Sequence, residues 1–102
     1  MKNNIKDYLD GYNETLKESI DEYDNISEWL HHQLGIKTVT DLQNERFYGA
    51  EVMLTAGGPN VWIDTRSDQI KGAWGVEKHR VPLDMDISER IHEEVRRLHE
   101  IY

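Results

Sequence analysis

The chain contains no cysteine, few basic residues and no long apolar run. The absence of cysteine excludes a disulfide framework, a thiolate nucleophile and a cysteine-based zinc site. No apolar run is long enough for a signal peptide or a membrane-spanning helix, so we expect a cytoplasmic protein with no membrane partner. With 12 basic and 20 acidic residues the net charge is −8, which predicts repulsion from nucleic acid and attraction to basic surfaces.

The sequence also lacks the common motifs of catalysis and cofactor binding. The glycines of AGGPN (56–60) lead into a strand-like VWIDT, with no GKS or GKT, which argues against a phosphate-binding loop. The five histidines form no HExxH or HxH pattern, and no serine lies in a GxSxG context. We therefore predict a protein that is not an enzyme and holds no metal or cofactor. A metal-dependent protein using His79, His92 or His99 is the third alternative.

The first third of the chain has the apolar spacing of helices. Six residues fall within roughly 80° of one helix face: Ile5, Leu9, Tyr12, Leu16, Ile20 and Tyr23. Asp24 or Asn25 can cap a second, shorter helix, which Gly35 would end. The buried face of that second helix is expected to comprise Ile26, Trp29, Leu30 and Leu34.

The end of the chain is helical again. Asp86, followed three residues later by Glu89, is typical of a helix N-terminus. Apolar residues then recur at helical spacing, at Ile87, Ile91, Val95, Leu98 and Tyr102.

Residues 36 to 83 change to the alternation and turn residues of strands. FYGAEVMLT (47–55), VWIDT (61–65) and QIKGAWG (69–75) predict three strands, and IKTVTDLQ (36–43) is a candidate fourth. A two-residue loop at 67–68 would place Asp64 opposite Lys71 and Trp62 opposite Ala73. The predicted fold is a single α+β domain, 1–102, with two N-terminal helices, a three- to four-stranded antiparallel sheet and one C-terminal helix, in the order α-α-β-β-β-α.

Negative charge is concentrated on the first helix. The first 35 residues carry eight acidic and three basic residues. Exposed helices usually mix charges to gain pairs between residues three or four apart, and this helix mostly does not. Carboxylates one turn, about 5.4 Å, apart approach the spacing of about 7 Å between phosphates of a nucleic-acid strand. The face either keeps the protein soluble or binds a basic partner, and its partner-binding candidates are Asp7, Asp10, Glu14, Glu18, Asp21 and Glu22.

Two tryptophans add a second kind of candidate. The segment from 55 to 75 contains Trp62 and Trp74 among turn glycines. An exposed tryptophan commonly anchors a protein interface. Trp62 and Trp74 therefore join the acidic residues as predicted partner-binding residues.

The run GGPNVWIDT followed by IKGAWG, after ISEWLHHQLG, resembles small acidic proteins encoded by bacterial phages and other mobile elements. The resemblance covers residues 12–102 and rests on turn glycines and tryptophans. The wider class includes anti-CRISPR and anti-restriction inhibitors, many of which occlude nucleic-acid sites on their targets. The resemblance implies an inhibitor in the bacterial host cytoplasm that binds a basic, nucleic-acid-binding host defence protein, with a CRISPR effector among the candidates. Partial mimicry of DNA by the acidic helix would provide the contact, without direct binding of nucleic acid.

A small homo-oligomeric structural or adaptor module, such as a homodimer, is the alternative. In that module the arginine-rich last helix of one copy would pair with the acidic first helix of another.

Overall fold

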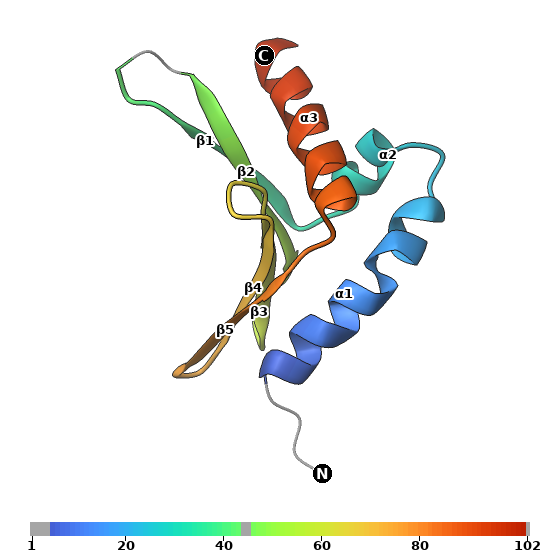
Figure 1. Cartoon of the computed structure of the whole chain (residues 1–102), viewed down its shortest axis with the longest axis vertical. Helices are drawn as coiled ribbons and strands as arrows, with labels where there is room; N and C mark the ends of the chain where they lie inside the picture. Colours follow the sequence, from blue (N-terminus) through green and yellow to red (C-terminus); the bar gives the residue numbers. More distant parts are fainter. Residues whose placement is uncertain (1–4, 44–45, 102) are drawn as a thin grey trace.

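The computed structural model describes residues 5–43 and 46–101 and places three helices on one face of an antiparallel sheet (Figure 1). The strands follow one another across the sheet in the order β1-β2-β3-β4-β5. The elements are α1 (Ile5–Asp21), α2 (Ile26–His31), β1 (Gly35–Thr40), β2 (Phe47–Thr55), β3 (Asn60–Asp64), β4 (Gln69–Trp74), β5 (Glu77–Pro82) and α3 (Met85–Ile101). The predicted α+β class and the placing of two helices before the sheet and one after it are confirmed.

The core lies between the sheet and the helices. A row of directly paired residues crosses four strands on the covered face, and all four side chains are buried: Val52, Ile63, Ile70 and Val81. At Gly72 of β4 an added Cβ would lie 2.8 Å from side-chain carbons of Ile5 and Leu9. The missing side chain at this position lets α1 pack closely on the sheet.

The sheet has five strands, so the prediction of three to four strands was too low. β5 was missed because its pattern is almost entirely polar, and Val81 is its one buried residue. The strand forms because β4 is paired along one edge with β3 and offers its other edge to the segment that follows. β4 and β5 form a hairpin whose two-residue loop contains Gly75, with φ of 64°, so pairing with β4 makes a strand where the alternation of side chains does not indicate one.

The predicted register between β3 and β4 was wrong by two residues. Asp64 lies opposite Gln69, and Trp62 lies opposite Lys71. The connection is four residues long, 65 to 68, and Asp68 takes a left-handed conformation with φ of 54°. The Asp68 carboxylate accepts a 2.6 Å hydrogen bond from the Ser88 hydroxyl, which ties this turn to the start of α3.

The helix boundaries also differ in part from the prediction. Asn25 caps α2 as expected, and its side chain accepts a hydrogen bond from the Glu28 backbone. However, α2 ends at His31, so Leu34 lies outside the helix and is 64% exposed. The α3 cap is Asp84, not Asp86, because the Asp84 carboxylate accepts from the first backbone amides of the helix. Tyr102 lies outside the described residues.

Candidate functional site

The acidic residues predicted to bind a partner lie together on the outer face of α1. Ile5, Leu9, Leu16 and Ile20 turn inward and are buried, which directs the opposite face of the helix to solvent. We call this outer set the acidic row; Asp10 is half-exposed and the others are exposed: Asp7, Asp10, Glu14, Glu18, Asp21 and Glu22. The helical period brings the first five carboxylates to one surface, and Glu22 follows directly after the end of α1.

Most of the acidic row forms no ion pair within the described part of the chain, although Lys17 lies on the same helix, three residues after Glu14 and four before Asp21. Lys6 lies 2.8 Å from Asp10, and this contact raises the pKa of Lys6. Among the described residues, no hydrogen bond or ion pair engages the side chains of the four acids nearer the end of α1: Glu14, Glu18, Asp21 and Glu22. The four side chains of this part of the row are exposed to solvent.

The last helix shows the opposite arrangement. Arg96 lies 2.6 Å from Glu93 and 2.9 Å from Glu100, and Arg97 lies 2.6 Å from Glu94. Hydrogen bonds from these arginines lower the pKa values of Glu93 and Glu94. The charges of α3 are thus largely balanced within the helix, whereas those of α1 are not.

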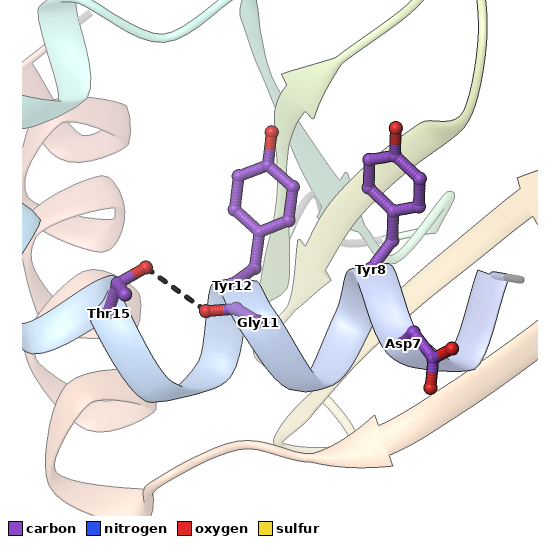
Figure 2. Close-up of a pocket in the computed structure, with 5 residues that line it drawn as sticks. All are labelled: Asp7, Tyr8, Gly11, Tyr12 and Thr15. Carbon is purple, nitrogen blue, oxygen red and sulfur yellow. Dashed lines mark hydrogen bonds between the residues drawn. The ribbon is translucent and has the colours of Figure 1, made fainter. Parts of the chain in front are cut away.

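A shallow groove with aromatic walls lies beside the acidic row, at Gly11 (Figure 2). Tyr8 and Tyr12 rise from the same side of α1, one turn apart, and Asp7 projects from another side. The groove has a volume of about 430 Å³, and Thr15 lines its far end. A cation placed there would contact tyrosine rings on one side and a carboxylate on the other, and both interactions are favourable.

Trp74 extends this aromatic surface. Its ring meets Tyr8 edge-on, with ring centres 5.1 Å apart, and Trp74 remains 37% exposed. Trp74 therefore lies next to the start of the acidic row. Tyr8 and Tyr12 were not among the predicted site residues, because Tyr12 belongs to the apolar face of the first helix and Tyr8 lies at its edge. The spacing of the two tyrosines around Gly11, which has no side chain, could have indicated a groove.

Trp62 does not join this surface. It lies on the face of the sheet opposite the helices, where it is half-buried. The eight predicted site residues therefore divide between two surfaces, with Trp62 alone on the second. The alternation of side chains in β3 shows that Trp62 and Ile63 point to opposite faces, but it does not show which face the helices cover.

The end of α1 offers a test of whether the acidic row stabilises the fold. The last turn of α1 has no basic residue, and Asp21 and Glu22 place negative charge at the negative end of the helix dipole. We expect Asp21→Lys with Glu22→Lys to raise the free energy of unfolding by about 1 kcal/mol and the melting temperature by about 5 °C. Thermal unfolding followed by circular dichroism measures this. Glu14→Lys, in mid-helix, is the control: it relieves repulsion from Asp10 and Glu18 without acting on the helix end, so it should stabilise by less, about 0.5 kcal/mol. Equal or lower stability of the double variant than of the wild type would show that these acids support the fold.

The histidines do not assemble a metal site. Within 5–43 and 46–101, no three His, Cys, Asp or Glu residues are grouped so that they could hold a metal ion. The rings of His92 and His99 both pack against Phe47, at 5.0 and 5.7 Å between centres. His92 also lies 3.0 Å from the Thr65 hydroxyl. These contacts give both residues a packing role.

No helix in the described part of the chain combines the length and apolar character needed to cross a membrane. Comparison of the chain with protein-family models, with curated proteins and with solved structures found no significant match.

Proposed function

We propose that this protein is a non-enzymatic inhibitor that binds, through the acidic row, a basic surface on a nucleic-acid-handling protein. The observation that supports this most directly is the set of exposed carboxylates on α1 that form no ion pair among the described residues. Unpaired like charges on one helix repel one another, so the arrangement disfavours the isolated fold. A partner lined with lysine and arginine would relieve that repulsion on binding.

Two parts of the surface contribute differently to this binding. Coulomb attraction between the acidic row and a basic channel speeds association, and salt weakens it. Trp74 and the groove between Tyr8 and Asp7 supply contacts that lose water on binding and thus slow dissociation. An arginine of the partner fits this groove by its chemistry, because its guanidinium can stack on tyrosine and pair with a carboxylate.

The resemblance to acidic proteins of phages and mobile elements supports a particular biological setting. In this proposal the protein acts in the cytoplasm of a bacterial host, and its target is a host defence protein such as a CRISPR effector. The acidic row occupies the channel that nucleic acid would otherwise enter, so the protein acts as a partial DNA mimic.

The proposal predicts that reversing charge in the acidic row removes binding. Glu14→Lys with Glu18→Lys should weaken binding to the captured target at least tenfold, since two unfavourable contacts cost more than the 1.4 kcal/mol that a tenfold change requires. Nuclease-treated lysate of a bacterial host, passed over immobilised protein and analysed by mass spectrometry, identifies the target. Titration of the purified target at several salt concentrations then measures the affinity.

The matched control is Asp86→Lys with Glu89→Lys on α3, which makes the same change in net charge at exposed positions. Circular dichroism checks that both double variants are folded. The control should bind as the wild type does, and single-stranded oligonucleotide should compete with the wild type for the target. Capture of the same proteins by wild type and Glu14→Lys, Glu18→Lys alike would refute binding through the acidic row.

The alternative of a homo-oligomeric module has less support. The arginine-rich last helix was expected to pair with a neighbour's acidic helix, and two of its three arginines, Arg96 and Arg97, already pair within α3. Light scattering of the purified protein separates the two proposals, because a salt-sensitive dimer would favour the module.

A further inference from the structure

The face of the sheet that points away from the helices carries a second surface, which the proposed function does not use. Alternate residues of the strands point to this open face, and adjacent strands place them side by side. One row crosses the sheet from Met53 through Trp62 and Lys71 to Arg80. Beside this row, Asn60, Ala73 and Lys78 are neighbours on β3, β4 and β5.

Trp62 is at the centre of this open face. Two grooves of about 570 and 620 Å³ meet at Trp62 and Ala73. Met53 and Asn60 line the groove towards β2, and Lys78 and Arg80 line the groove towards β5. The open face therefore offers apolar surface around Trp62 and a cationic half along β5. Lys37 and Glu51, which are directly paired on β1 and β2, also line the other groove.

The positive charge of the cationic half is not neutralised within the protein. Lys71 lies 2.8 Å from Asp64, and Arg66 contacts both Asp64 and Glu51, so these two cations are paired. Lys78 and Arg80 are exposed, and no ion pair or hydrogen bond engages their side chains among the described residues. They are two residues apart on β5, so their side chains stand about 6.6 Å apart on the same face.

We propose that the open face binds an acidic segment of a partner protein that carries a large apolar side chain. The apolar side chain packs on Trp62, Met53 and Ala73, and adjacent carboxylates pair with Lys78 and Arg80. Trp62 is half-buried, and a tryptophan that lines a groove with polar residues around it is typical of an interface anchor. This site lies on the opposite face of the sheet from α1 and does not depend on the acidic row.

The observations favour an acidic protein segment over a nucleic acid. Positive charge that forms no ion pair among the described residues lies in two separate places on the open face, at Lys78 and Arg80 on β5 and at Lys37 on β1. Glu51 and Asp64 place carboxylates on the strands between them. A long polyanion that crossed the sheet would meet those carboxylates and the net charge of −8. A short acidic segment would contact only Lys78 and Arg80 with its carboxylates, and its apolar side chain would pack on the surface around Trp62.

The test is selection of a displayed library of random 12-residue peptides on the immobilised full-length protein. We expect enriched peptides to carry Asp or Glu next to Leu, Phe or Trp. Fluorescence anisotropy of synthetic copies should show at least tenfold weaker binding to Trp62→Ala and to Lys78→Glu with Arg80→Glu. The control Lys17→Glu with Arg90→Glu makes the same charge change on the helices and should bind as the wild type does.

Several results would overturn the proposal. These are an absence of enriched peptides, enrichment of peptides without acidic residues, and binding that the Lys78 and Arg80 substitutions leave unchanged. Tighter binding of a labelled twelve-nucleotide oligo-dT than of any selected peptide would assign the open face to nucleic acid instead.

Since Lys78 and Arg80 are exposed and unpaired, their substitution should leave the fold intact, which circular dichroism verifies. The proposed function is unaffected by any of these results, because Glu14→Lys with Glu18→Lys tests it separately.

Discussion

Replacing Trp29 with alanine is expected to lower the free energy of unfolding by about 3–5 kcal/mol, the cost of deleting a buried aromatic side chain. Trp29 is the largest fully buried side chain of the described residues, at 1% exposure. Its indole N–H donates a 3.3 Å hydrogen bond to the Ser19 hydroxyl of α1. It also belongs to α2, which packs against α3, so its loss loosens all three helices. A domain of this size has a total stability of about 5–15 kcal/mol, and the variant would retain a fraction of it.

Urea and thermal unfolding, followed by circular dichroism, measure this effect. The melting temperature should fall by about 15 °C or more. Trp29→Phe is the matched control, since it retains most of the ring but leaves the Ser19 hydroxyl without its donor. We expect that variant to lose about 1–2 kcal/mol. A loss below 1 kcal/mol for Trp29→Ala would mean that the helices move together and fill the space of the deleted ring. That result would contradict the role of Trp29 in holding the three helices in place.

Replacing Asp64 with alanine is expected to lower the free energy of unfolding by about 1–3 kcal/mol, because its polar partners would lose their hydrogen-bond acceptor. The Asp64 side chain is almost fully buried and receives hydrogen bonds from Lys71 at 2.8 Å and from the Arg66 guanidinium and backbone. Arg66 also lies over Gly49, where an added Cβ would overlap it, so the carboxylate holds this side chain against the sheet. Both cations are partly exposed and can regain water, which limits the cost below that of a fully buried pair.

Asp64 also makes stability depend on pH. Burial by itself would raise the pKa of Asp64, but the hydrogen bonds from Lys71 and Arg66 outweigh burial, so its pKa is lower than the ordinary 3.8. A carboxyl with a lower pKa in the folded protein stabilises the fold above its unfolded pKa. That contribution is lost as pH falls through the folded pKa.

The measurement is urea unfolding of wild type and Asp64→Asn between pH 7 and pH 2. We expect the wild type to be more stable at pH 7 and its advantage to shrink below about pH 4. Comparison with Asp64→Asn removes the parallel contributions of Glu93 and Glu94, which also have lowered pKa values. An advantage of the wild type that persists undiminished at pH 2 would contradict this role for Asp64.

The candidate site shows where prediction from sequence succeeds. The acidic row follows from the helical period alone, because residues three and four apart lie on one face of any helix. The same period predicted the inner face of α1. Ile5, Leu9, Leu16 and Ile20 are buried as expected, whereas Tyr12 and Tyr23 are half-buried and Tyr23 lies beyond the end of the helix. The tryptophans could not be placed in this way. Whether Trp62 faces the helices or solvent depends on which face of the sheet the helices cover, and that is a contact between distant segments.

The sequence by itself determined the local elements of this protein: the amphipathic helices, a cap of the second helix at Asp24 or Asn25, the alternation in β2 to β4 and the charge on α1. Each of these depends on residues within a few positions of one another. Only the tertiary structure decided the fifth strand, the pairing of Trp62 with Lys71 and the contact of Asp64 with Lys71 and Arg66. These features arise when strands pair and helices cover one face of the sheet, and free energy from burial and from hydrogen bonds between strands then outweighs the preference of the single segment.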